Sequence, residues 1–244
     1  MIAFHQKLSE LIGVLAASLG NSCRSCWLGF TADLGIRGKK EGVFNWEITA
    51  FYIAYNGRIG QVLRADQPPL YNDYRFRSNI SDARNIGIEA FGEVDILRIL
   101  GNNHAQLRWN WFVNAAVVDA RYIHTEDASV RNKRVEMAPP LMLRSGTSFQ
   151  YRRWRGAFQM GYIAAHYSDA TNAERTATAV EGRIPAYTVA DFSVSWRWKW
   201  LSIEGSCNNL LDERYFTRRA ESYPGPGIIP AEGRGFYVTA GVKI

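Results

Sequence analysis

Residues 106–117 read QLRWNWFVNAAV, and side-chain polarity alternates along the stretch. One set of alternate positions carries only apolar side chains: Leu107, Trp109, Trp111, Val113, Ala115 and Val117. The polar side chains lie at the intervening positions: Gln106, Arg108, Asn110 and Asn114. A period of two sustained over this length predicts a β-strand with one face in apolar surroundings. The stretch is also long enough to cross a bilayer on a tilt.

The same period recurs along most of the chain. The strands that it predicts span residues 30–37, 44–52, 85–94, 106–117, 141–150, 157–167, 187–198, 201–208 and 236–244. The connections between them alternate in length. Short turns near residues 39–42, 101–103, 152–156 and 199–200 alternate with long polar loops over 56–78, 119–136, 170–183 and 211–233. Membrane β-barrels have short turns at one end and long loops at the other.

The composition supports this interpretation. The chain has 244 residues, of which 47% are hydrophobic and 21% charged, and this excludes a disordered protein. No apolar run reaches the length of a membrane-spanning helix. Aromatic residues make up 13% of the chain, and many lie near predicted strand ends, as at a membrane–water interface. We therefore expect an all-β fold: an antiparallel transmembrane β-barrel segment of about nine strands, with short periplasmic turns and long extracellular loops.

Several functional classes lack their sequence signals. The net charge of +6 is spread along the chain without a nucleic-acid-binding motif, so no nucleic-acid partner is expected. The pair Cys23 and Cys26 lacks the two further ligands of a zinc site, and we expect neither metal nor cofactor. There is no G-x-S-x-G and no convincing triad, which argues against an enzyme such as a barrel lipase. His166 and Asp169 favour a satisfied polar pair over a metal or acid–base site.

Four segments carry a resemblance to a known family. Residues 208–244, NNLLDERYFTRRAESYPGPGIIPAEGRGFYVTAGVKI, resemble the C-terminal end of TonB-dependent outer-membrane receptors. The stretch ADLGIRGKK at 32–40, followed by WEITAFYIAYNGRIGQV at 46–62, and RSNISDARNIGIEA at 77–90 are similar to internal strands of that family. Within that family, the sequence is similar to the iron-chelate group, which resembles the ferric-citrate receptors. The resemblance covers roughly residues 30–244 and leaves 1–26 as an ill-defined N-terminal segment.

The resemblance implies a function in transport. Receptors of this family close a barrel of about 22 strands around an N-terminal plug, and TonB supplies the energy that displaces the plug. It implies that residues 27–244 are the C-terminal part of such a barrel in the bacterial outer membrane, and that the chain is a fragment not competent for transport alone. The expected partners are a ferric chelate (a siderophore or ferric citrate), outer-membrane lipid and lipopolysaccharide. The TonB complex would act only through a missing plug region.

Arginines in the predicted outer loops are the candidate ligand-binding residues, because a guanidinium stays charged and binds carboxylates with two parallel hydrogen bonds. The candidates are Arg75, Arg77, Arg131, Arg134, Arg218 and Arg219. The same arginines would also suit lipopolysaccharide phosphates or ion pairs with acidic neighbours. One alternative function is a small stand-alone porin-like barrel, which would need a tenth strand from residues 1–26 to reach an even strand number. A soluble β-rich binding module is a further alternative.

Overall fold

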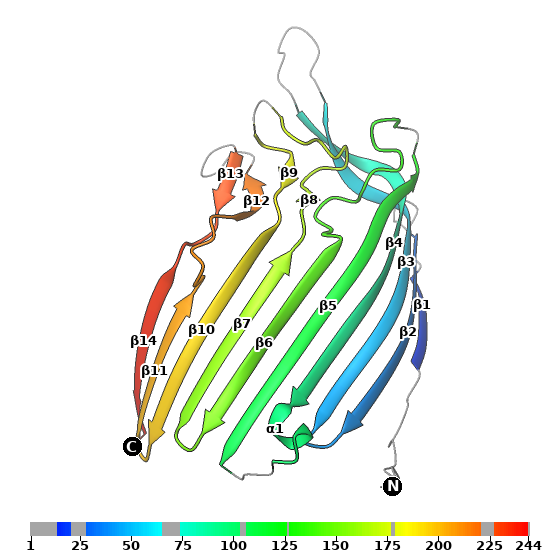
Figure 1. The fold of residues 1–244 in the computed structure, drawn as a ribbon. Helices are drawn as coiled ribbons and strands as arrows, with labels where there is room; N and C mark the ends of the chain where they lie inside the picture. The colour runs from blue at the N-terminus through cyan, green and yellow to red at the C-terminus, as the bar shows by residue number, and fades with distance from the viewer. Residues whose placement is uncertain are drawn as a thin grey trace.

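The computed structural model describes residues 14–20, 28–64, 74–102, 106–125, 127–176, 179–220 and 227–243. Its main feature is one antiparallel sheet of ten strands in the order β1-β2-β3-β4-β5-β6-β7-β10-β11-β14 (Figure 1). The strands are β1 (Val14–Gly20), β2 (Leu28–Lys40), β3 (Phe44–Arg64), β4 (Tyr74–Asp95), β5 (Leu107–His124), β6 (Leu141–Tyr151), β7 (Trp154–Ile163), β10 (Tyr187–Trp198), β11 (Leu201–Asn208) and β14 (Gly235–Val242).

All nine predicted strands are confirmed, as β2 to β7, β10, β11 and β14. The tenth strand, β1, lies in the segment to which the sequence assigned no structure, and it pairs with β2. The prediction of a loop over 56–78 was wrong in extent, because β3 continues to Arg64 and β4 begins at Tyr74. A register irregularity between Tyr55 and Arg58, with Gly57 at φ +65°, breaks the period of two there and conceals the continuing strand.

The connections alternate in length as predicted. Four short connections, at residues 41–43, 96–106, 152–153 and 199–200, lie at the end of the sheet that also holds the C-terminus (Figure 1). We call this the short-turn end; it includes the one-turn helix α1 (Ile96–Ile99). The opposite, long-loop end carries two small pairs, β8 (His166–Tyr167) with β9 (Arg183–Ile184), and β12 (Phe216–Ala220) with β13 (Gly227–Pro230).

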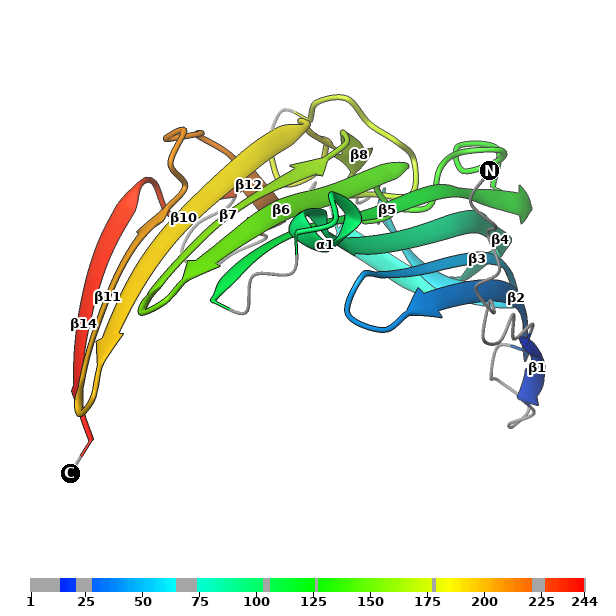
Figure 2. The same ribbon diagram turned by 60° about the horizontal axis from the view of Figure 1, so that its bottom comes forward.

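The sheet is arched, with β14 along one edge and β1 along the other (Figure 2). Within the described ranges these two edge strands do not pair with each other, so the sheet remains open. Neighbouring strands pair in continuous antiparallel registers, such as Leu107 with Tyr151 through Val117 with Leu141. Among the described residues, no helix is long and apolar enough to span a membrane.

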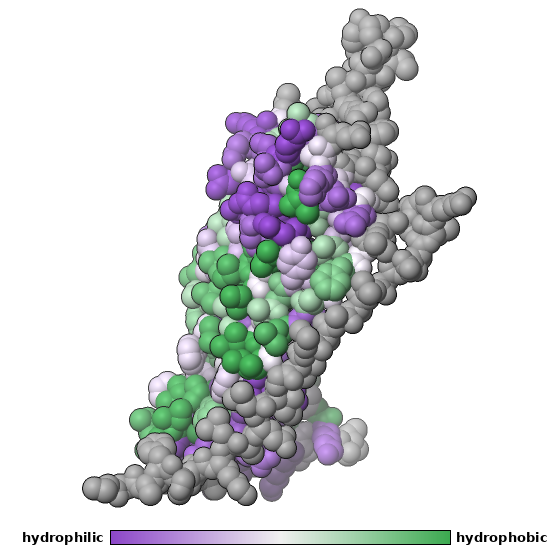
Figure 3. Space-filling model, turned by 90° about the vertical axis from the view of Figure 1, so that its right-hand side faces the viewer, coloured by the Kyte–Doolittle hydropathy of each residue, from purple (hydrophilic) through white to green (hydrophobic). Residues whose placement is uncertain are grey.

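The sheet has one apolar and one polar face. Large apolar side chains at alternate positions are more than a third exposed on the apolar face: Leu34, Ile36, Ile48, Ile88, Trp109, Trp111, Phe149, Trp154, Phe158, Phe192, Val194, Ile203 and Val238. Apolar side chains gather at mid-height, and hydrophilic ones gather toward the long-loop end (Figure 3). The intervening positions carry polar or charged side chains, such as Arg37, Glu47, Glu89, Arg144 and Asp191. An apolar band of this kind suits lipid contact.

Polar groups on the apolar face are paired across strands. The Nε1–H groups of Trp109 and Trp111 donate to Thr147 Oγ1 at 2.8 Å and Ser145 Oγ at 3.0 Å. Each hydroxyl in turn donates to a carbonyl oxygen of β5, at 3.0 Å in both cases. An unpaired indole N–H costs free energy in apolar surroundings, so these pairs let tryptophan lie on a lipid-facing surface.

On the polar face, aromatic rings pack over glycines of the neighbouring strand. Phe112 lies directly opposite Gly146, and Phe51 lies opposite Gly87. A Cβ added at Gly146 would lie 2.6 Å from the Phe112 ring and 2.9 Å from the carbonyl oxygen of Phe158. The glycine is therefore required by the close approach of both groups.

We predict that Gly146→Ala destabilises the sheet by about 1–3 kcal/mol, because the new methyl group overlaps a backbone oxygen that cannot move alone. Urea unfolding of the refolded chain in detergent micelles measures the change. Gly92→Ala is the matched control, because a Cβ there meets only Val113 Cγ1 at an ordinary 3.7 Å. Equal stability of the two variants would contradict the packing described for Gly146.

Candidate functional site at the long-loop end

The connections at the long-loop end are packed together around a small buried core. Residues 125–140, between β5 and β6, contribute Val130 and Val135, and the connection after β7 contributes Ala170. They pack against Tyr122 of β5, whose side chain is fully buried, against Ala83 of β4 and against Tyr55 of β3. The core thus fixes two loops against three strands.

A polar cluster beside this core joins three parts of the chain. The Tyr122 hydroxyl donates to Glu136 Oε2 at 2.5 Å, and the other oxygen of that carboxylate accepts from Arg58 Nη2 at 3.4 Å. The guanidinium of Arg58 also lies 6.0 Å from the centre of the Tyr122 ring. Sequence reasoning missed this cluster, because its members are far apart in the chain and match no motif.

A second set of contacts links the β5–β6 and β7–β10 connections. Asn172 Oδ1 accepts from the backbone N–H of Arg134 at 2.7 Å, and its Nδ2 donates to the Arg134 carbonyl at 2.8 Å. The Asn172 side-chain amide therefore pairs with both backbone groups of Arg134, as a residue of a neighbouring strand would. Asp169, 3% exposed, accepts from the backbone N–H of Thr171 at 3.0 Å and from its hydroxyl.

His166 is also buried, and its Nδ1 lies 3.1 Å from the carbonyl oxygen of Ala164. Among the described contacts neither ring nitrogen bonds to the Asp169 carboxylate, so the prediction of a satisfied His166–Asp169 pair was wrong. Nearby, burial and the Glu174 carboxylate raise the pKa of Tyr167, whose hydroxyl donates to Glu174 Oε1 at 3.1 Å. These contacts stabilise the fold of the connection between β7 and β10.

The predicted arginines have different environments. Arg219 donates from Nη1 to Ala179 O at 2.7 Å and from Nη2 to Arg183 O at 3.0 Å, and it lies over the Phe216 ring. It thereby fixes the β12–β13 hairpin against the connection between β7 and β10. Burial lowers the pKa of the Arg219 guanidinium, and the charge of Asp169 opposes that shift. Arg218, its neighbour on the hairpin, is exposed.

The other candidates are dispersed rather than gathered at one point. Arg131 is exposed in the turn after Val130, and Arg134 is half-buried beside Asn172. Arg75 and Arg77 lie on β4, where their backbones pair with Leu63 and Gln61. In the described part of this end, the exposed side chains of Arg131 and Arg218 make no hydrogen bond or ion pair. Their charges remain available to a ligand.

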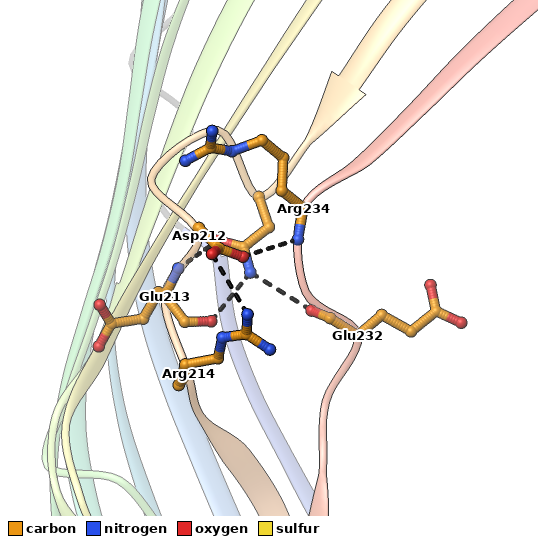
Figure 4. Close-up of polar contacts among 6 residues, drawn as sticks. Asp212, Glu213, Arg214, Glu232 and Arg234 are labelled. Atoms are coloured by element: carbon orange, nitrogen blue, oxygen red, sulfur yellow. Dashed lines mark hydrogen bonds and ion pairs between the residues drawn. The ribbon is translucent and has the colours of Figure 1, made fainter.

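Residues 209–214, NLLDER, follow β11 and hold the chain on either side of the last long connection together. We call this segment the latch. Asn209, 3% exposed, donates from Nδ2 to the carbonyls of Glu213 (2.9 Å) and Glu232 (3.3 Å), and its Oδ1 accepts from the Glu213 N–H at 2.9 Å. Asp212 Oδ1 accepts from the backbone N–H of Arg234 at 3.1 Å (Figure 4). The connection leaving β11 is thereby tied to the segment that enters β14.

The Asp212 carboxylate is stabilised by its neighbours in this latch. The backbone N–H of Arg234 and the charge of Arg214, 3.3 Å away at its Nη2, lower the pKa of Asp212. Asn209 and Asp212 both have positive φ, near +50°, a conformation that asparagine and aspartate tolerate better than most residues. The residue types in this segment therefore serve the turn rather than a ligand.

The described residues contain no cluster of side chains that suits metal or thiol chemistry. Among those residues, no group of three or more His, Cys, Asp or Glu side chains could hold a metal ion. Cys207 is buried and free, and Cys23 and Cys26 lie outside the described residues. What the long-loop end offers is charge and hydrogen bonding on a fixed surface.

Comparison with known proteins agrees with this architecture. The family model for the TonB dependent receptor-like β-barrel matches residues 28–210, so the chain belongs to this family. The ferric citrate transporter FecA, unliganded, superposes with a TM-score of 0.68 at 19% identity, covering 88% of this chain and 31% of that one. The ferric yersiniabactin uptake receptor FyuA from Yersinia pestis superposes with a TM-score of 0.66 at 18% identity, covering 88% of this chain and 30% of that one.

The copper transporter OprC gives a TM-score of 0.66 at 14% identity, covering 88% of this chain and 31% of that one. No curated protein matches the sequence. At these identities the likeness shows the fold alone. The chain spans about a third of the length of the solved structures that it matches.

We predict that Asn209→Ala destabilises the protein by about 2–4 kcal/mol, because it removes three buried hydrogen bonds and places alanine at positive φ. The loop over 211–234 should also become more susceptible to proteolysis. Asn208→Ala is the control, since Asn208 is exposed and its side chain bonds to nothing in the described chain. An Asn209→Ala protein as stable and protease-resistant as the control would rule out the latch.

Proposed function

We propose that this chain forms the C-terminal part of the barrel of an outer-membrane receptor that takes up a ferric chelate. The observation that carries the proposal is the combination of the family match with a long-loop end on which the Arg131 and Arg218 side chains are exposed. In this assignment the apolar face contacts lipid, the short-turn end faces the periplasm and the long-loop end faces the medium. The protein's chemistry is recognition, with no bond made or broken.

The fixed geometry of the long-loop end supports a role in ligand capture. Arg131 and Arg218 extend from connections that are held by buried contacts, namely the core around Val130 and the hairpin pinned by Arg219. Because the backbone that carries each guanidinium is already fixed in this way, binding an anion has to order only the arginine side chain and not the loop. Ferric citrate and ferric siderophores that carry carboxylates are anionic and match this charge.

The cargo class is the finer part of the proposal. The neighbours in fold are named for ferric citrate, ferric yersiniabactin and copper, so the fold is compatible with more than one metal cargo. The arginine-bearing loops favour an anionic chelate over a bare cation. Transport would in addition need a plug region that TonB can engage, and that requirement is part of the proposal.

A small porin-like barrel is the second candidate, because β1 supplies the tenth strand that an even-numbered barrel needs. Such a barrel would require β1 and β14 to pair with each other. Single-channel recording in a planar bilayer separates the two candidates: a porin gives stable conductance steps, whereas a receptor segment gives none.

We predict that the double variant Arg131→Gln/Arg218→Gln weakens binding of radiolabelled ferric citrate to cells producing the protein by about tenfold, or ~1.4 kcal/mol. The loss reflects charge-assisted hydrogen bonds to the citrate carboxylates. Arg197→Gln/Lys199→Gln removes the same charge at the short-turn end and should leave binding unchanged. Equal affinity of the two double variants would contradict the role given to the outer arginines.

A further inference from the structure

The tryptophans of this protein gather at the short-turn end. Seven of the eight lie within five residues of a short turn: Trp46, Trp109, Trp111, Trp154, Trp196, Trp198 and Trp200. Several are widely exposed, including Trp154 at 54% and Trp200 at 59%. The rings of Trp154 and Trp196 are 6.3 Å apart, and those of Trp196 and Trp198 are 5.8 Å apart. Amphipathic rings of this kind favour the level of lipid headgroups.

Positive charge gathers at the same end. Nine basic residues lie within two residues of the short turns: Lys39, Lys40, Arg98, Arg108, Arg152, Arg153, Arg155, Arg197 and Lys199. Only two acidic residues, Glu41 and Asp95, lie within the same limits, and both already pair locally with Lys39 and Arg98. This end therefore carries more positive charge than the net +6 of the whole chain.

The two features meet at the β6–β7 turn. Here an open hollow of roughly 890 Å³ is lined by Gln106, Arg108, Gln150, Tyr151, Arg152, Arg153, Trp154 and Trp196. The hollow is lined from both faces of the sheet, because it lies where the strands end. The apolar face contributes Tyr151, Trp154 and Trp196, and the polar face contributes Arg108 and Gln150. A molecule with an apolar part and an anionic part fits such a position.

The two turn arginines are held by their surroundings. The backbone N–H of Arg152 donates to Gln106 O at 3.1 Å, and its Nε donates to the Gln106 side chain at 3.3 Å. Its guanidinium lies 5.2 Å from the Tyr151 ring centre, and that of Arg153 lies 5.3 Å from the Trp198 ring centre. In the described structure neither guanidinium forms an ion pair with a carboxylate, and the two acidic residues of this end, Glu41 and Asp95, pair with Lys39 and Arg98. Both guanidinium groups therefore lie beside aromatic rings at the boundary of the apolar band.

We propose that this hollow binds the phosphate of an anionic glycerophospholipid, with Arg152 and Arg153 as phosphate ligands and the tryptophans against the glycerol and upper acyl region. The inference rests on the proposed placement of the sheet in the outer membrane, with this end at the periplasmic leaflet. Guanidinium groups bind phosphate oxygens with paired hydrogen bonds. Basic clusters next to a membrane surface are drawn to anionic lipid. A peptide partner would not need the tryptophan belt around the turn.

Fluorescence quenching tests this directly, because seven of the eight tryptophans report on this end. The full chain is refolded into phosphatidylcholine vesicles that contain phosphatidylglycerol, with bromine on the acyl chains of one lipid or the other at equal mole fraction. Brominated phosphatidylglycerol should quench about twofold more than brominated phosphatidylcholine. Arg152→Gln/Arg153→Gln should abolish that preference, and Arg152→Lys/Arg153→Lys should retain part of it.

The matched control is Arg131→Gln/Arg218→Gln, which removes the same charge from exposed positions at the other end and should keep the full preference. Equal quenching by the two lipids in the wild-type protein would overturn the lipid site while leaving the membrane placement intact. A preference that survives Arg152→Gln/Arg153→Gln, or that disappears in the control, would also overturn it. Quenching by neither lipid would contradict the membrane placement itself.

Discussion

Every backbone N–H and C=O group in the hydrocarbon layer of a membrane needs a partner within the protein, since lipid offers none. The described sheet meets this demand through continuous strand-to-strand pairing from β2 to β14. The same demand explains the side-chain pairs on the apolar face, where Thr147 and Ser145 accept the indole N–H groups of Trp109 and Trp111. The same demand applies to the two edge strands, β1 and β14, because each has one side that is unpaired within the described sheet.

The two ends of the sheet are built on different principles. At the long-loop end, connections are fixed by buried and half-buried side chains. Each of these side chains holds backbone or side-chain groups of another segment: Tyr122, Glu136, Asn172, Asn209 and Arg219. At the short-turn end, three of the four connections are tight turns and the fourth holds the one-turn helix α1. Tryptophan and arginine side chains gather there in place of folded loops. The first arrangement suits the capture of a small ligand, and the second suits a fixed position in a lipid leaflet.

The sequence predicted the strands well, because an apolar face and a polar face leave a clear period of two, as in residues 106–117. It failed where that period breaks: the irregularity at Tyr55–Arg58 concealed the outer parts of β3 and β4. The candidate site was harder to predict. The structure gives Arg219 two carbonyl partners and leaves Arg218 exposed, a difference between adjacent residues of the same type that depends on a connection some 40 residues away.

We propose that the sheet crosses the outer membrane with its long loops outside, and cysteine accessibility tests this orientation most directly. In a chain whose native cysteines Cys23, Cys26 and Cys207 are replaced by alanine, Arg131→Cys and Lys199→Cys place single thiols at opposite ends. A membrane-impermeant maleimide added to intact cells should label position 131, and it should label position 199 only after the outer membrane is permeabilised. Labelling of position 199 in intact cells, or protection of position 131, would contradict the account.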